Sequence, residues 1–269
     1  GHLWWFGIQA TGPNECRAHV RQLVKEGVDF IKITASGGST GTSIPLRPSF
    51  NLEEMSAIVD EAHKFGKHTA AHCTNSQSMI NALDAGIDTI IHGVYNEPDG
   101  DRSYRADITE RIVEKGVFLN PTIHQSRERI WQLEEKSQNE NLTLEEIDEL
   151  NITKQNHEER IEEVSKMWDA GVKIVCGSDS AWANYKMGRF QADINSHISI
   201  GMSPMEAILS ATSLSAQSCC VDDQVGTLEV GKNADILVVE GDPSKNIDDL
   251  WNIVDIYQNG ELIDRGNYI

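Results

Sequence analysis

Four short apolar runs, each carrying a side chain that can bind a metal, restrict the fold of this 269-residue chain more than any other feature. Each run is rich in β-branched residues, and each follows an amphipathic stretch that closes on a glycine. A repeated order of helix, glycine and short apolar strand is typical of a parallel βα array. The side chains that the runs carry, at or near their ends, are Lys32, His72, His92 and Asp179.

Such an array brings distant positions together, because the carboxyl ends of neighbouring parallel strands converge on one face. We therefore expect Lys32, His72, His92 and Asp179 to share one site. Imidazole nitrogen suits Zn²⁺ and carboxylate oxygen suits most divalent metals, but a lysine must lose its charge or be modified before it can bind a metal. A buried lysine that pairs with Asp179 is the alternative interpretation of Lys32.

Five segments around these residues, spread over nearly all of the chain, occur in the order typical of one known family. Residues 31–38 contain the lysine, residues 71–72 and 91–93 the two histidines, and residues 177–180 the aspartate; residues 226–236 read GTLEVGKNADI. Together they resemble the amidohydrolase superfamily, in the branch of Xaa-Pro dipeptidases, related carboxypeptidases and imidazolonepropionase-like enzymes. The last segment is similar to the family's return into a small β domain.

The resemblance implies an α/β fold. Residues 1–225 would form a partial (β/α)8 TIM barrel, about strands four to eight with the preceding helix. Residues 226–269 would be the C-terminal piece of a small β-sandwich domain, and the Asn259-Gly260 pair there is typical of a hairpin turn. Between the seventh and eighth barrel strands, residues 126–168 are expected to form an inserted helical arm.

Members of this superfamily carry a His-x-His pair at the end of the first barrel strand, and the sequence has no such pair. The resemblance therefore implies a chain that begins partway through the barrel. It also implies two divalent metals, with Zn²⁺ expected, in the complete enzyme and one or none in this fragment. Lys32, His72, His92 and Asp179 would be the remaining ligands, with Lys32 carboxylated so that it bridges the metals as an anion.

The same resemblance implies hydrolysis of an amide bond by a metal-activated water. Asp179 would be the general base, and His124, at the end of the apolar run 117–124, would donate a hydrogen bond to the substrate. Tyr95 could contact the substrate from a loop, and Arg189 could bind a carboxylate. The alternatives are an aromatic packing role for Tyr95, a loop histidine without a catalytic role for His124, and a surface ion pair for Arg189.

Composition limits the partners of the chain. Its net charge of −19 argues against a nucleic-acid or anionic-membrane surface, because phosphate binding depends on clustered Lys and Arg. No 18-residue apolar run and no basic-then-apolar leader is visible, so the cytoplasm is the default expectation. An open barrel edge would expose unpaired strand groups, which predicts association of copies into a homo-oligomer.

The substrate is the least determined part of the prediction. A dipeptide, an N-acyl amino acid and a cyclic amide all suit enzymes that resemble this chain. A different class of function is a non-catalytic or truncated barrel fragment with an incomplete metal site. A deaminase is a further alternative, against which Lys32 argues, since mononuclear deaminases generally lack the bridging lysine.

Overall fold

The computed structural model describes residues 2–180 and 185–267, and these form two compact units. The first unit comprises the chain up to Pro121 together with Asp169–Ile174. The second comprises Thr122–Trp168 and the chain from Val175 onward. The predicted boundary between residues 225 and 226 lies inside the second unit, and the division into domains at that point stays a prediction.

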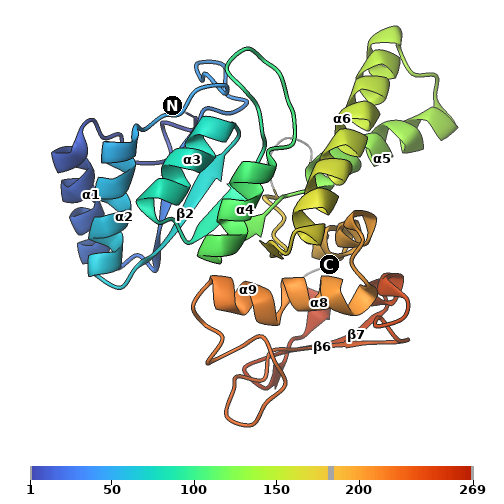
Figure 1. Ribbon diagram of the computed structural model, residues 1–269. Coiled ribbons are helices and arrows are strands. Elements are labelled where there is room, and N and C mark those ends of the chain that lie inside the picture. Colours follow the sequence, from blue (N-terminus) through green and yellow to red (C-terminus); the bar gives the residue numbers. More distant parts are fainter. Residues whose placement is uncertain (1, 181–184, 268–269) are drawn as a thin grey trace. The chain divides into compact units, whose positions relative to one another are not determined.

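A five-stranded parallel sheet organises the first unit, with its strands in sequence order. The helices between them pack beside the sheet, and Figure 1 shows α1 next to α2, and α3 in front of β2. The strands are β1 (Phe30–Thr34), β2 (His68–Cys73), β3 (Thr89–His92), β4 (Phe118–Asn120) and β5 (Lys173–Ile174). The helices are α1 (Pro13–Glu26), α2 (Leu52–Lys64), α3 (Ser76–Ala85) and α4 (Ala106–Lys115).

Glycines end these helices as the sequence predicts. Gly27 and Gly86 cap α1 and α3 with φ of 89° and 86°, a left-handed conformation that costs glycine nothing. Each cap turns the chain back into the next strand of the sheet. The core of the unit then forms between strand residues such as Ile31 and Ile33 and the buried face of α2, which includes Met55 and Val59.

The second unit begins with a pair of long helices, α5 (His124–Asn139) and α6 (Leu144–Asp169), which form a helical hairpin (Figure 1). Ion pairs such as Arg129–Glu149 at 2.6 Å and Lys136–Glu146 at 2.6 Å join the two helices. The predicted helical arm is thereby confirmed. Shorter helices follow: α7 (Phe190–Ser196), α8 (Pro204–Ala211), α9 (Ser213–Ser218) and the 3-10 segments η1 (His197–Ile200), η2 (Ile247–Trp251) and η3 (Arg265–Asn267).

A three-stranded antiparallel sheet lies near the carboxyl end of the chain. Its strands are β6 (Ile236–Val239), β7 (Ile253–Gln258) and β8 (Glu261–Leu262), and Asn259 and Gly260, with φ of 51° and 80°, form the turn between β7 and β8. The predicted hairpin is therefore present. The α/β class with a parallel sheet is confirmed, whereas membership of this small sheet in a β-sandwich stays a prediction. None of the helices in the described part of the chain is both long and apolar enough to span a membrane.

Candidate metal centre

Two histidines meet at the carboxyl ends of neighbouring strands in the first unit. His72 lies near the end of β2 and His92 is the last residue of β3, and their ring centroids are 4.7 Å apart with the planes at 81°. His72 is buried and His92 is partly exposed. Parallel neighbours in a sheet thus bring together two imidazoles that are 20 positions apart, as the sequence predicts.

The backbone of His92 departs from strand geometry, and this places its ring. The register pairs Cys73 with His92 and His72 with Ile91, so regular alternation would put the two histidines on opposite faces of the sheet. His92 instead has φ of 68°, and Gly93 follows with φ of 65°. The left-handed turn directs the His92 ring toward His72, and the Gly93 N–H then donates to the Cys73 carbonyl at 3.0 Å.

Lys32 lies on the neighbouring strand β1. Its register partner is Ala70, and two residues later Thr34 pairs with His72, so Lys32 and His72 belong to the same face of the sheet. Lys32 is exposed, while Ile31 and Ile33 on the other face are each 3% exposed. This alternation places the lysine on the face that carries the histidines.

His2 is a residue of this site that the sequence analysis did not predict. Its ring stacks on that of His72, with centroids 4.9 Å apart and an angle of 22°, and its Nδ1 lies 3.2 Å from the Thr40 hydroxyl. A Cβ added to Gly38 would come within 2.6 Å of the His2 ring, so the stack requires glycine there. No strand or helix pattern surrounds His2, and only the folded chain places it beside His72.

The side chains of the first unit provide some of the ligands that a divalent metal needs. Two imidazoles in close contact can supply two nitrogen ligands, and Lys32 could supply a third only after conversion to an anionic carbamate. Within residues 2–180 and 185–267, no three His, Cys, Asp or Glu side chains lie close enough to hold one ion. Cys73 is fully buried, and burial raises the pKa of its thiol to about 12, which suits packing rather than ligation.

Tyr95 packs inside the first unit. Its side chain is fully buried, its hydroxyl lies 2.6 Å from the Thr109 hydroxyl of α4, and its ring meets Tyr104 edge to face. These contacts support the packing interpretation of Tyr95. Its contact with a substrate stays a prediction.

Asp179 belongs to the second unit, after the short strand β5 and the apolar residues that follow it. Its backbone also has a left-handed φ, 49°, which is uncommon for a residue other than glycine. The Gln125 side-chain amide donates to Asp179 Oδ2 at 2.8 Å and to the Asp179 carbonyl at 3.3 Å. Gln125 thus orients the predicted general base within its own unit.

The other two predicted site residues of this unit, His124 and Arg189, are joined by a buried glutamate. His124 is fully buried and sits 3.2 Å from Glu128 through Nε2, while Arg189 donates to both Glu128 oxygens at 2.9 and 3.1 Å. Arg127 donates to His124 Nδ1 at 3.0 Å. Nδ1 therefore accepts, so the Nε2–H of a neutral His124 donates to Glu128.

Burial, followed by the charges of Arg127 and Arg189, lowers the pKa of His124 to about 3. His124 is therefore neutral near pH 7, and both of its ring nitrogens are used inside the unit. Arg189 forms an ion pair with Glu128; its alternative interpretation expected such a pair at the surface, whereas the Glu128 carboxylate is buried. The substrate-binding roles of both residues stay predictions.

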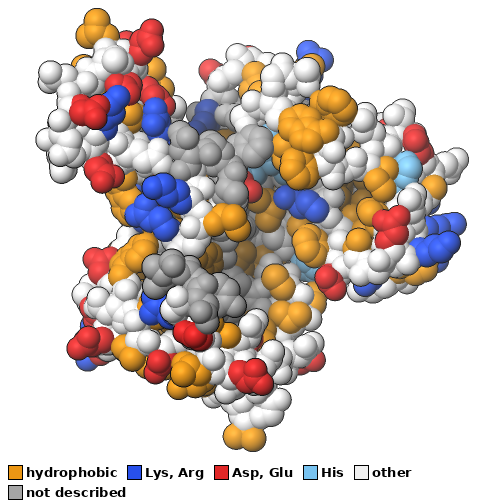
Figure 2. All heavy atoms as spheres, turned by 180° about the vertical axis from the view of Figure 1, so that it is seen from behind, with side chains coloured by type: hydrophobic (Ala, Val, Ile, Leu, Met, Phe, Trp, Pro, Cys, Tyr) orange, Lys and Arg blue, Asp and Glu red, His pale blue; other side chains and the backbone are white. Residues whose placement is uncertain are grey.

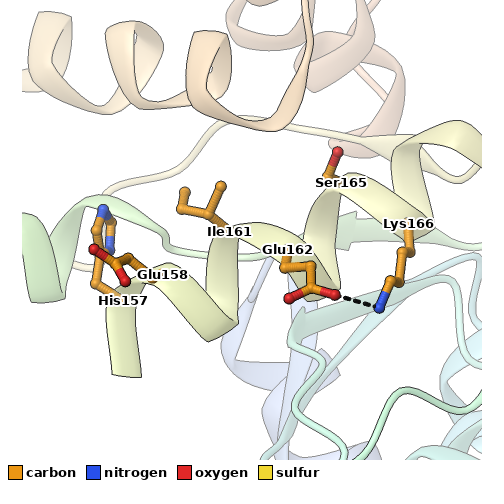
Figure 3. Close-up of a pocket in the computed structure, with 6 residues that line it drawn as sticks. All are labelled: His157, Glu158, Ile161, Glu162, Ser165 and Lys166. Atoms are coloured by element: carbon orange, nitrogen blue, oxygen red, sulfur yellow. Dashed lines mark hydrogen bonds and ion pairs between the residues drawn. The ribbon is translucent and has the colours of Figure 1, made fainter. Parts of the chain in front are cut away.

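A separate cavity of about 470 Å³ lies along α6. The described residues that line it all come from this helix, and Glu162 pairs with Lys166 at 2.7 Å. Figure 3 shows this pair and, beside it, Ile161. The lining shares no residue with the predicted metal centre.

Comparisons with known proteins agree with these observations. Ochratoxinase from Aspergillus niger is 27% identical over 240 residues, which make up 88% of this chain and 46% of that protein. The crystal structure of a Xaa-Pro dipeptidase with bound methionine in the active site matches with a TM-score of 0.76 and 30% identity, over 95% of this chain and 59% of that one. A prolidase complexed with N-methylphosphonate-L-proline matches with a TM-score of 0.72 and 26% identity, over 95% and 59%.

The chain therefore spans about half the length of the curated relatives it matches. The profile of the Amidohydrolase family aligns with residues 3–263, which is nearly the whole chain. This match covers the lysine strand, both histidine strands and the segment that contains Asp179. The chain belongs to the amidohydrolase family.

Proposed function

We propose that this chain carries part of the metal centre of a hydrolase that cleaves amide bonds. His72 and His92 would hold a divalent metal, with Zn²⁺ expected, and Lys32 would join them as a carbamate. Asp179 would complete the ligands that the chain itself contributes. The contact of the His72 and His92 rings at the ends of adjacent parallel strands carries the proposal, and membership of the amidohydrolase family supports it.

Each side chain of the proposed centre would have a distinct role in amide hydrolysis. A divalent metal bound there would acidify the attacking water and polarise the scissile carbonyl. Asp179 would take the proton of the water and deliver it to the leaving amine, and the hydrogen bond from Gln125 would keep its carboxylate oriented. Carboxylation would change Lys32 from a cation that repels a metal into an anion that attracts one.

The fold that would surround this centre is also part of the proposal. The parallel sheet and its helices suit strands four to eight of a (β/α)8 barrel, because each strand is followed by a helix and the strand order is sequential. The substrate would be a small amide: a dipeptide, an N-acyl amino acid or a cyclic amide. The likeness to a Xaa-Pro dipeptidase and to a prolidase favours dipeptides with a carboxyl-terminal proline.

Metal binding tests the proposal directly. The metal-free chain should take up Zn²⁺, measured by elemental analysis and by competition with a chromophoric chelator. His72→Ala and His92→Ala should each weaken Zn²⁺ binding by about 100-fold or more, since loss of a ligand should cost at least as much as the 10- to 100-fold loss typical of a ligand's hydrogen-bonded partner. The mass of the intact protein should show one added CO₂ that Lys32→Ala removes.

His63→Ala is the matched control. His63 lies on α2, where it pairs with Asp88 at 2.7 Å and takes no part in the centre. Its replacement should leave Zn²⁺ binding unchanged. A wild-type chain that takes up no Zn²⁺, or a loss in His63→Ala as large as in His72→Ala, would contradict the proposed centre.

One observation supports the alternative of a non-catalytic barrel fragment with an incomplete metal site. In the described part of the chain, no three His, Cys, Asp or Glu side chains are near enough to share an ion. Under this alternative the chain would bind Zn²⁺ weakly and would not hydrolyse Xaa-Pro dipeptides or N-acyl amino acids. Amine release from such substrates by the Zn²⁺-loaded chain, absent in Asp179→Asn, would decide in favour of the hydrolase.

A further inference from the structure

One backbone carbonyl beside the proposed centre lies within hydrogen-bond distance of three side chains, those of Ser36, His72 and Thr74. The Gly37 carbonyl oxygen lies 3.1 Å from His72 Nε2 and accepts from the Thr74 hydroxyl at 2.8 Å. Gly37 is buried and follows β1, whereas His72 and Thr74 lie at the end of β2 and just after it. The loop after one strand thus contacts a proposed ligand on the next.

This contact determines which nitrogen of His72 carries the proton. A carbonyl oxygen can only accept a hydrogen bond, so Nε2 must be the N–H donor. A neutral imidazole then has its lone pair on Nδ1. Ligating histidines usually donate their other ring N–H to a carbonyl or carboxylate, which sets both the tautomer and the plane of the ring.

The Thr74 hydroxyl is itself held by a buried partner. Its oxygen lies 2.8 Å from the hydroxyl of Ser36, which is 0% exposed, and the Thr74 N–H donates to the same Ser36 oxygen at 2.9 Å. The Ser36 hydroxyl also lies 3.1 Å from the Gly37 carbonyl, so Ser36 and Thr74 form a small polar cluster around that carbonyl, in which Thr74 makes the shorter contact. A threonine in this setting can orient that carbonyl without touching a metal or a substrate.

The loop leaves no room for a side chain at Gly37. A Cβ there would come within 2.3 Å of the Ile44 backbone, because the loop folds back on itself. The Gly38 N–H donates to the Ser43 hydroxyl at 2.7 Å, and the Asn75 side chain donates to the Pro45 carbonyl at 2.8 Å. These contacts hold the segment from Gly37 to Pro45 against the end of β2.

We propose that Thr74 is a positioning residue: through the Gly37 carbonyl it keeps His72 in the Nε2–H tautomer, with Nδ1 presented as the ligand atom. The proposal rests on the proposed metal centre only for the use of Nδ1. The tautomer itself is a property of the metal-free chain, and it can be measured without a metal.

The test compares Thr74→Val, which removes the hydroxyl at nearly constant shape, with Thr74→Ser, which keeps it. In the metal-free full chain labelled with ¹⁵N at histidine, wild type and Thr74→Ser should both show His72 as the Nε2–H tautomer, assigned by the loss of its signal in His72→Gln. Thr74→Val should show a mixture of tautomers. Its Zn²⁺ dissociation constant should rise about tenfold, at the lower end of the range for such partners.

The outcomes separate this inference from the proposed function. An unchanged His72 tautomer in Thr74→Val overturns the role of Thr74, whatever the metal affinity. A tautomer shift without any Zn²⁺ binding by wild type supports the role of Thr74 and removes the metal centre. An equal loss of Zn²⁺ affinity in Thr74→Val and Thr74→Ser also overturns the role of Thr74, because the hydroxyl would then not be the cause of the loss.

Discussion

Backbone conformation at single residues decides how the ends of the strands present their side chains. His92 is the last residue of β3, Thr122 lies two residues after β4 and Asp179 lies five residues after β5, and they have φ of 68°, 48° and 49°. Such values cost a non-glycine residue free energy and concentrate at functional sites, where the surrounding structure maintains them. Two of the three are proposed metal ligands, so the unusual backbone supports the location of the centre independently of the sequence pattern.

Buried histidines in the second unit should make its stability depend on pH. His197 is 2% exposed, with Nδ1 2.9 Å from the Ser210 hydroxyl, and burial followed by the charge of Arg127 lowers its pKa to about 4. Between pH 6.5 and about pH 4 the unfolded chain therefore binds a proton that the folded chain does not. The free energy of unfolding should fall as the pH falls through this range.

Replacement of His197 by glutamine, which can still bond Ser210, should reduce this dependence. From pH 7.5 to pH 5, the variant should lose about 2 kcal/mol less unfolding free energy than wild type, measured by urea denaturation. Taking the difference between the two proteins cancels Asp193, whose pKa burial raises to about 6 and which works in the opposite direction. Equal losses in both proteins would show that His197 does not carry the effect.

Helix boundaries depend on local contacts, and α2 is a clear case. Asn51 accepts a hydrogen bond from the Glu54 N–H at 2.9 Å, while the Glu54 carboxylate accepts from the Asn51 N–H at 3.0 Å, which forms a capping box. The other Glu54 oxygen accepts from the Gly12 N–H at 2.9 Å, directly before α1. One glutamate therefore joins the starts of two helices that pack together.

Asn51→Ala should lower the free energy of unfolding by about 1 kcal/mol, because the helix loses an N-cap acceptor. Asn51→Ser should retain most of the stability, since a serine hydroxyl can accept the same bond. Thermal and urea unfolding of the two variants would measure the difference. If both variants lost the same stability, the cap would not be the source.

The surface of the whole molecule combines strong negative charge with exposed aromatic side chains. Hydrophobic side chains reach the surface at many places, as Figure 2 shows for one face. Near the start of the described chain, Trp4, Trp5 and Phe6 are 49%, 54% and 81% exposed. In the described sheet β1 is an edge strand, so its outer backbone groups could pair with another chain. The net charge of −19 opposes such association.

We expect the purified chain to associate at micromolar concentration, and more strongly at high salt, where the repulsion is screened. A variant that combines Trp4→Ser, Trp5→Ser and Phe6→Ser should sediment more like a monomer than the wild-type chain does. Leu144→Ser, which changes an apolar side chain that is 81% exposed on α6, is the control and should leave association unchanged. A wild-type chain that stays monomeric at high salt would contradict this expectation.

The sequence by itself determined the α/β class, the helix-closing glycines, the helical arm and the pairing of His72 with His92 at one end of the sheet. These features follow from periodicity and from residue types with strong local preferences, so they are visible without tertiary contacts. Only the tertiary structure decided the left-handed turn at His92, the stacking of His2 on His72 and the bond from His72 to the Gly37 carbonyl. The packing of Tyr95 and the pairing of Arg189 with Glu128 were likewise decided by partners distant in sequence, since no local pattern specifies which groups meet once the chain is folded.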